Sequence, residues 1–303
     1  MNRRRPGILP LFFLFATISC ASVTRTIDKG TGAVGEVLLP VSEEVKLGNQ
    51  LAAEVNKQER IHPDPQVQAY VAAVGKRIAA ASRDSRKGIA YRFTVIDDPR
   101  TINAFALPGG HIYVYSGLIL ATKSEAELAA VLGHEVGHVT CRHAARSLGT
   151  AYSLEALSRL AMGNDPGTVA QLAAAIAAQG YMSRHSREAE READARGLDY
   201  LIAAGYDPNA MPAFFDTLGR HSGSPHAIEK FFASHPQPAE RAQSLRKLIR
   251  ERKAAKGRTE IVGGFAEVQA RLGKKSSSSS GSATPSKSNQ QDSAPQPAPR
   301  PAR

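Results

Sequence analysis

Two histidines four residues apart, with a glutamate directly after the first, constrain this chain more than any other feature of its sequence. The segment is HEVGH, from His134 to His138. Residues i and i+4 of a helix share one face, so both imidazoles can reach a single metal ion. Glu135 would lie beside that metal and can take a proton from water bound to it, as in zinc hydrolases.

The residues around HEVGH predict the helix that this arrangement needs. Ser124 followed by Glu127 is a capping-box pattern for its start, and Gly149 is its expected end. Between them apolar residues recur at helical spacing, namely Leu128, Val131, Leu132, Val136 and Val139. The competing interpretation, two surface histidines on a helix, is disfavoured by this apolar face.

A catalytic zinc ion needs a third protein ligand, and His143 is the nearest candidate. The pattern HExxHxxGxxH would place glycine at position 141 and histidine at 144, whereas this chain has Cys141 and Ala144. His143 lies five residues after His138, on a different helix face. We interpret His143 as a structural or surface residue and Cys141 as a buried, inert thiol.

A second predicted helix, capped by Ser186 and Gly205, offers a glutamate instead. Glu190 can bind zinc, and Asp194 can accept a hydrogen bond from a histidine ligand and so orient its ring. Gly197 would let the two helices approach closely. On spacing alone, a solvated charged helix remains an equally good interpretation. The residues that share this face are Glu190, Asp194, Gly197 and Leu201.

Taken together, HEVGHVTCRH, SREAEREAD and the preceding NAFALPGG resemble metallopeptidase family forty-eight. The motifs occur in the family's order, and the similarity runs from about Glu43 to Arg250. The resemblance implies an α+β, mainly helical, zincin-like (gluzincin) fold with a small β-sheet and an HExxH active-site helix. No periodic repeats follow this body, so the helical-repeat domain of some members is not expected. The implied ligands of one Zn²⁺ per chain are His134, His138 and Glu190, with Asp194 as a supporting partner.

The resemblance also extends to SHPQPAER, which is similar to the family's SHPxxxxR, whose His and Arg lie near the metal. It implies catalytic roles for Glu135, His235 and Arg241. Glu135 would activate zinc-bound water and return the proton to the leaving amine. His235 would donate a hydrogen bond to the tetrahedral intermediate, or close the zinc site as a reversible plug, and both roles stay open. Arg241 would support His235 or hold substrate carbonyls.

The segment NAFALPGGHIYVY predicts two short strands joined at Pro108–Gly110, with a further strand at Tyr91–Ile96. In the family the corresponding hairpin supplies an edge strand above the zinc, to which an extended peptide can add by main-chain hydrogen bonds. His111 is not counted among the metal ligands. The predicted substrate-binding residues are Ala104, Phe105, Ala106, His111, Ile112, Tyr113 and Val114.

Other helices are predicted at Glu43–Glu59 and Asp64–Ala81, after Pro208 and after Pro238. The Ala- and Leu-rich segment 150–182 predicts two helices joined by a turn. This segment can act as a lid on the site or simply complete the core.

The ends of the chain are predicted to lie outside the fold. Three arginines precede an uncharged stretch, as in a signal peptide, and Cys20 then resembles the lipidated cysteine of a lipoprotein, although Thr17 stands where leucine is usual. A lipid anchor at Cys20 would tether the chain to the periplasmic side of the bacterial outer membrane. The expected division is a signal peptide (1–19), a linker (20–42), a zinc metallopeptidase domain (43–273) and a disordered Ser/Pro-rich tail (274–303).

The net charge of +11 is concentrated at these ends. Residues 1–19 carry +3 and the tail +4, which leaves +4 for the body. Such a balance gives no electrostatic footprint for nucleic acid.

The sequence therefore predicts a zinc metalloendopeptidase of the cell envelope. Its expected substrates are misfolded or unassembled envelope proteins. The alternative is a periplasmic chaperone or assembly factor that uses the same groove with little proteolysis. A zinc-stabilised structural lipoprotein is the third and weakest interpretation.

Overall fold

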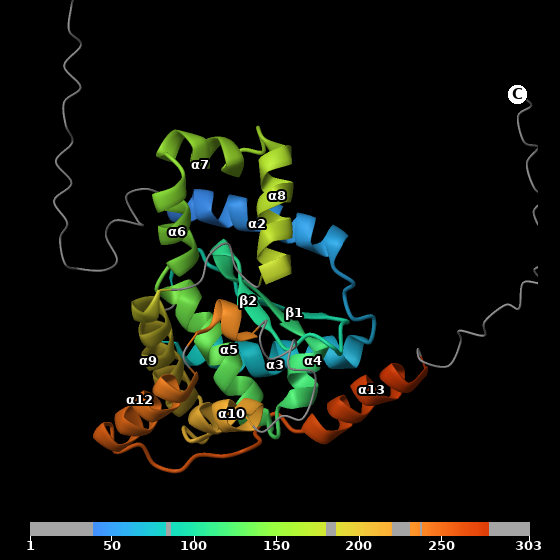
Figure 1. Cartoon of the computed structure of the whole chain (residues 1–303), viewed down its shortest axis with the longest axis vertical. Helices are drawn as coiled ribbons and strands as arrows, with labels where there is room; N and C mark the ends of the chain where they lie inside the picture. The colour runs from blue at the N-terminus through green and yellow to red at the C-terminus, as the bar shows by residue number, and fades with distance from the viewer. Residues whose placement is uncertain (1–38, 83–85, 180–185, 220–230, 237, 279–303) are drawn as a thin grey trace, which may run out of the picture.

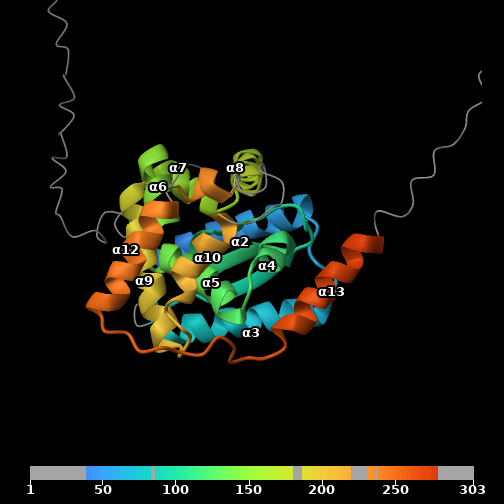
Figure 2. The same ribbon diagram turned by 60° about the horizontal axis from the view of Figure 1, so that its bottom comes forward.

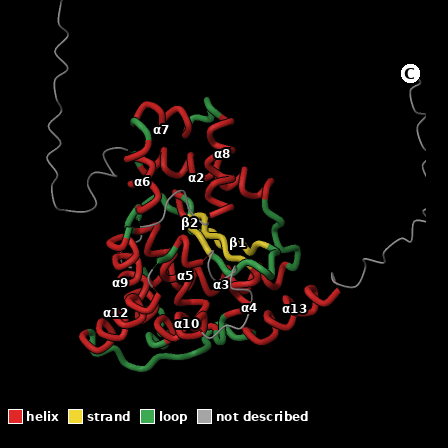
Figure 3. The backbone as a smooth tube through the Cα atoms, in the orientation of Figure 1, coloured by secondary structure: helices red, strands yellow, loops and turns green. Residues whose placement is uncertain are grey.

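The computed structural model describes residues 39–82, 86–179, 186–219, 231–236 and 238–278. Helices surround one small three-stranded sheet (Figures 1 and 3), which confirms the predicted α+β, mainly helical class. The strands are β1 (Arg92–Ile96), β2 (Ala104–Ala106) and β3 (His111–Tyr115). The helices are α2 (Val41–Gln58), α3 (Pro65–Ala81), α4 (Ser116–Ala121), α5 (Glu125–Thr140), α6 (His143–Ala151), α7 (Leu154–Ala161), α8 (Pro166–Gln179), α9 (Arg187–Ala203), α10 (Ala210–Gly219), α12 (Pro238–Glu251) and α13 (Phe265–Ser278).

β3 is the central strand of the sheet. β1 pairs with it in parallel and β2 pairs with it antiparallel, so β2 forms one edge. A short 3-10 turn, Pro108–Gly110, joins β2 to β3. Gly109 and Gly110 adopt φ of 76° and 93° there, a backbone region that costs glycine little because it has no Cβ. The predicted turn at these residues is confirmed.

The two faces of the sheet belong to different hydrophobic clusters because successive side chains of a strand point to opposite faces. On β3, Ile112 and Val114 enter the cluster shared with α3 and α5, while Tyr113 and Tyr115 enter the cluster shared with α2, α7 and α8. Phe105 of β2 joins the second cluster. Figures 1 and 2 show α2, α7 and α8 on one side of the sheet and α3 and α5 on the other.

α5 and α9 pack closely because small residues face each other at their contact. A Cβ on Gly137 would lie 2.7 Å from the carbonyl oxygen of Ala193. A Cβ on Gly197 would lie 2.8 Å from the main-chain nitrogen of His134. Both distances are shorter than van der Waals contact allows. The predicted role of Gly197 in close helix approach is confirmed, and HEVGH is thereby brought against α9.

α5 begins as predicted and ends earlier than predicted. The Ser124 side chain accepts a hydrogen bond from Glu127 N at 3.2 Å and caps the helix. The helix stops at Thr140 rather than at Gly149. Arg142 adopts a left-handed φ of 58°, which breaks the helical path, and α6 then starts at His143 in a new direction.

The segment after α6 folds as the predicted pair of helices joined by a turn, with Gly163 at φ 77° in that turn. α7 and α8 pack on α2 and bury Leu157, Leu160 and Ile176, so they complete the second cluster. α13 continues to Ser278, five residues past the predicted start of the tail at residue 274. Within the described ranges, no helix has the length and apolar character needed to cross a membrane.

Candidate metal centre

α5 carries both histidines of HEVGH on one buried face. His134 and His138 are one turn apart, and their Nε2 atoms lie 2.9 Å from each other. Both rings and Glu135 are at most 5% exposed. The i, i+4 spacing thus converges two imidazole nitrogens on one point, as the sequence predicts.

α9 supplies a carboxylate to the same point. Glu190 Oε2 lies 3.5 Å from His134 Nε2, and Glu190 Oε1 lies 3.4 Å from His138 Nε2. Tetrahedral zinc with bonds of about 2.0–2.1 Å holds its ligand atoms roughly 3.3–3.4 Å apart. The three side chains therefore fit a zinc ion in donor chemistry, and both distances from the carboxylate to the imidazoles match its ligand spacing. The two Nε2 atoms, 2.9 Å apart, lie somewhat closer than that spacing.

Two charged side chains, Asp194 and Arg241, contact the predicted ligands and hold them in place. Asp194 Oδ1 lies 2.9 Å from His134 Nδ1, which orients the ring. Arg241 of α12 binds Asp194 at 2.6 Å and also contacts Glu190. Burial by itself raises the pKa of Glu190, but the charges of Arg241 and the neighbouring histidines outweigh it and hold that pKa well below its usual range. Arg241 thus stabilises the ionised carboxylates, and it also lines a pocket that reaches Glu135.

His235 closes the fourth side of the group. Its Nδ1 lies 3.3 Å from His134 Nε2 and 3.4 Å from each oxygen of Glu190. Its Nε2 lies 3.7 Å from Glu135 Oε1. One ring thus contacts both the ligand set and the predicted base. This placement fits the plug as well as the hydrogen-bond donor predicted for His235.

Glu135 sits where a general base would act. Its Oε1 is buried, and no hydrogen bond to it is formed by the residues that the structure describes. Burial raises its pKa, and the opposing charges of His235 and His134 only partly offset that shift. A raised pKa brings a carboxylate closer to the value suited to proton transfer near neutral pH.

The edge strand β2 passes alongside these groups. Leu107 N donates to His111 O at 2.8 Å, and hydrogen-bonded pairs alternate along an antiparallel ladder. The main-chain groups of Ala104 and Ala106 therefore point away from β3, although Ala104 N is bonded to the Asn103 side chain. Ala106 can thus pair with an added strand.

β3 does not offer such an edge. Its main chain lies between β1 and β2, so the predicted substrate contacts at His111–Val114 find no open hydrogen-bonding edge. His111 bonds Asn49 Oδ1 at 2.8 Å, and the other three side chains are buried in the two clusters. The peptide-binding hypothesis is carried by β2 alone.

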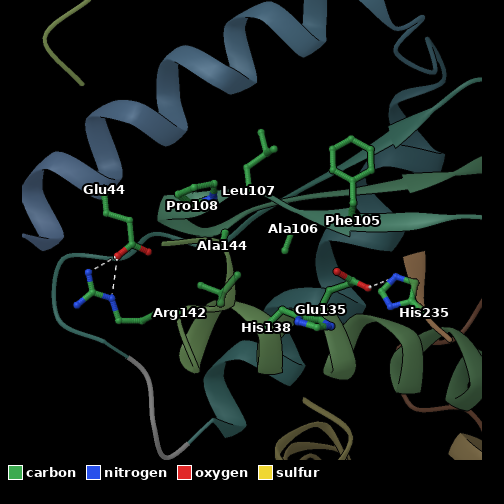
Figure 4. Close-up of a pocket in the computed structure, with 11 residues that line it drawn as sticks. Glu44, Phe105, Ala106, Leu107, Pro108, Glu135, His138, Arg142, Ala144 and His235 are labelled. Atoms are coloured by element: carbon green, nitrogen blue, oxygen red, sulfur yellow. Dashed lines mark hydrogen bonds and ion pairs between the residues drawn. The ribbon is translucent and has the colours of Figure 1, made fainter. Parts of the chain in front are cut away.

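Two pockets reach Glu135 at the centre. One runs between β2 and α5, where Ala106, Glu135 and His138 share its wall with His235 (Figure 4). Its far end is closed by the ion pair of Glu44 and Arg142 (2.8 Å). The other pocket is mainly apolar and reaches His134, Glu135 and Arg241. Its remaining walls are Ala130, Val131, Met211, Phe214, Phe215 and Phe231.

His143, interpreted from the sequence as a structural or surface residue, is buried, and its contact with a predicted ligand was not foreseen. It is 4% exposed, and its Nδ1 lies 2.8 Å from Nδ1 of His138. The helix break at Arg142 turns it back onto the ligand, and no glycine or asparagine marks that break. The predicted lipidation site, Cys20, lies outside the described residues.

The fold and this centre together define a zincin-like peptidase domain. Residues 65–249 match the model of peptidase family M48. The match covers more than half of the chain, and the chain therefore belongs to peptidase family M48.

Curated relatives agree with that membership. The chain is 31% identical over 229 residues to a beta-barrel assembly-enhancing protease of Yersinia pestis, covering 72% of this chain and 46% of the relative. It is 32% identical over 219 residues to the mitochondrial metalloendopeptidase OMA1 of Arabidopsis thaliana, covering 69% and 43%. The metalloprotease YcaL of Escherichia coli is 29% identical over 232 residues, covering 74% and 86%. The chain thus spans less than half the length of the first two.

Proposed function

We propose that this chain is a zinc-dependent metalloendopeptidase of the bacterial cell envelope that hydrolyses peptide bonds in misfolded or unassembled proteins. The observation that carries the proposal is the convergence of His134, His138 and Glu190 at ligand spacing, directly beside Glu135. A purely structural zinc site has no use for a buried base next to its ligands.

The side chains divide the work of hydrolysis. When bound, one zinc ion per chain would act as a Lewis acid that polarises water and the substrate carbonyl. Glu135 Oε1 accepts the proton of the attacking water and passes it to the leaving amine, which its raised pKa favours. Asp194 and Arg241 keep His134 and Glu190 in place.

His235 accounts for control of the site. In the arrangement described here its ring occupies the fourth side of the ligand group, so it must move before a substrate carbonyl can approach. In the structure, Nε2 of His235 lies 3.7 Å from Glu135. After the ring has moved, this nitrogen can donate a hydrogen bond to the developing oxyanion. The plug and the donor are thus two positions of one ring.

The substrate is proposed to lie as an added strand along β2. Main-chain pairing with Ala106 would hold an extended chain with little dependence on its sequence, which suits an enzyme for unfolded proteins. The pocket walled by Phe214, Phe215 and Phe231 would take an apolar side chain next to the scissile bond, because that pocket reaches Glu135.

The envelope location rests on two supports. Relatives from Yersinia pestis and Escherichia coli are named for beta-barrel assembly, an envelope process. The basic N-terminus followed by an apolar stretch and Cys20 has the pattern of a lipoprotein signal. Lipidation at Cys20 would anchor the enzyme to the outer membrane on its periplasmic side.

The test compares the full-length chain with Glu135→Gln on fluorescently labelled casein, with zinc quantified in both. Wild-type cleavage and a loss of about 10²–10⁴-fold in the zinc-loaded variant are expected. Mapped cleavage sites should carry an apolar residue beside the cut. Equal cleavage by the variant would refute Glu135 as the base.

A chaperone is the second candidate, favoured by the closing position of His235 and by the open edge of β2. If the chain is a chaperone, the wild type and Glu135→Gln should both bind zinc and suppress casein aggregation equally, and neither should cleave casein.

A further inference from the structure

The two histidine ligands of the centre are supported in different ways. His134 Nδ1 contacts a carboxylate directly, at 2.9 Å from Asp194 Oδ1. His138 Nδ1 instead contacts another imidazole, at 2.8 Å from Nδ1 of His143. His143 Nε2 then lies 3.2 Å from Glu192 Oε2. We propose that His143 and Glu192 are positioning residues that hold His138 in its metal-binding orientation, an inference that rests on the proposed zinc site.

A consistent set of hydrogen positions exists for the contacts from His138 through His143 to Glu192. If His138 uses Nε2 for zinc, its hydrogen is on Nδ1 and is donated to Nδ1 of His143. The hydrogen of neutral His143 is then on Nε2 and is donated to Glu192. In this assignment each of the two contacts has one donor and one acceptor, so the contacts orient both rings. A support of this kind raises the affinity of the histidine for the metal.

Local structure explains why these residues meet. The left-handed Arg142 ends the path of α5 and starts α6 at His143, so the ring is directed back toward His138. Glu192 comes from α9, two residues after Glu190 and two before Asp194. Arg146 of α6 binds Glu192 at 3.2 Å and fixes its carboxylate. α5, α6 and α9 therefore each contribute to the same small network.

A second metal site is the competing explanation, because Cys141, His143 and Glu192 could also gather around an ion. Three observations disfavour it. His143 already bonds the predicted ligand His138, and the guanidinium of Arg146 beside Glu192 opposes a further cation. Burial also raises the pKa of the Cys141 thiol to about 11, which disfavours the thiolate that binds metals.

The experiment measures zinc affinity of the full-length protein by competition with a chelating dye. His143→Leu removes the acceptor and should raise the zinc dissociation constant by about 10–100-fold. His143→Asn returns an oxygen close to the place of Nδ1 and should recover most of that loss. Glu192→Gln keeps an acceptor but loses the charge, so its effect should be the smaller one. Cobalt-loaded His143→Leu should also show a shifted visible absorption spectrum.

His62→Leu is the matched control. His62 is also buried, but it accepts a hydrogen bond from Asp64 N, outside the centre. This variant should bind zinc like the wild type. The proposal is overturned by unchanged zinc affinity and an unchanged cobalt spectrum in His143→Leu. It is also overturned by two zinc ions per chain, one of them lost in Cys141→Ser.

These readouts do not depend on proteolysis. Weakened zinc binding in His143→Leu supports the positioning role even if the wild type cleaves nothing, an outcome that would count against the peptidase alone. Intact cleavage together with unchanged zinc binding in His143→Leu would remove the positioning role and leave the peptidase proposal in place.

Discussion

The two faces of the sheet are stabilised by different physical means. On the α5 side, buried charges accumulate at the contacts with α9 and α12, including Glu135, Glu190, Asp194 and Arg241. On the other side, the buried side chains that the structure describes in α7 and α8 are all apolar, and the buried charge of α2 is confined to Glu44, which pairs with Arg142. On the α5 side, paired charges and close helix packing set the geometry. On the α7–α8 side, the burial of apolar side chains provides the stability. A function that needs exact placement of polar atoms thus resides in the region that is harder to stabilise.

The largest effect is expected where that charge network is opened. Arg241→Leu leaves Glu190 and Asp194 buried without their shared positive partner, and removing one member of a buried ion pair costs about 3–5 kcal/mol. Urea unfolding of metal-free protein measures the change. Arg246→Leu, on the same helix but exposed with its partner Asp216, should stay within about 1 kcal/mol. If both variants lose the same free energy of unfolding, the buried charge network stabilises the fold no more than an exposed ion pair does.

The apolar region should respond to a cavity and leave the metal centre intact. Leu160→Ala in α7 removes a side chain that is 3% exposed, which should cost about 2–4 kcal/mol. Zinc affinity should not change, because α7 contributes no residue to the centre. Leu154→Ala, at an exposed position of the same helix, should cost less than about 0.5 kcal/mol. A loss of zinc affinity in Leu160→Ala would show that the two regions are coupled.

The α5–α9 contact allows the opposite perturbation, since it has no room for an added methyl group. Gly197→Ala places a Cβ against the backbone of Gly133 and His134 and should cost about 1–3 kcal/mol. Because Glu190 and His134 move apart with the helices, zinc affinity should fall as well. Gly219→Ala, where a Cβ meets nothing within 4 Å, is the control. Stability lost without any change in zinc binding would argue against this link.

Much of the centre follows from local sequence. The i, i+4 spacing of HEVGH and the cap at Ser124 place two imidazoles on one buried face. The charged helix after Ser186 then carries Glu190 and Asp194 on the face that meets them. Gly197 indicates where α9 packs against the HEVGH helix. These features depend on helix periodicity, which a single segment of sequence records.

The features that were missed depend on tertiary structure or on weak local signals. The break at Arg142 uses a left-handed arginine, so the sequence does not mark the turn that buries His143. The central place of β3 is decided by pairing with β1, which lies 15 residues or more away in the chain. The helix α13, which begins inside the predicted peptidase domain, was not predicted, although Phe265, Val268 and Leu272 recur at helical spacing.

The smallest predicted effect concerns pH and the start of α5. Glu125 accepts five hydrogen bonds, two from the hydroxyls of Tyr70 and Tyr206 and three from the main chain of residues 261–263. Burial raises its pKa, but these bonds outweigh burial and bring the pKa below its usual value. The unfolded chain therefore takes up this proton first as the pH falls, so stability from Glu125 is present above the ordinary pKa near 4.5 and is lost below it.

Glu125→Gln should cost about 1–2 kcal/mol at pH 7, because an amide replaces a charged acceptor of main-chain hydrogen bonds. The difference between wild type and variant should shrink as the pH falls from 6 toward 3, as measured by urea unfolding. A constant difference across that range would mean that Glu125 is not ionised in the folded protein. Because Glu125 fixes residues 261–263 against the first turn of the HEVGH helix, this carboxylate extends the charge-based stabilisation of the α5 side to the end of α5 farthest from His138.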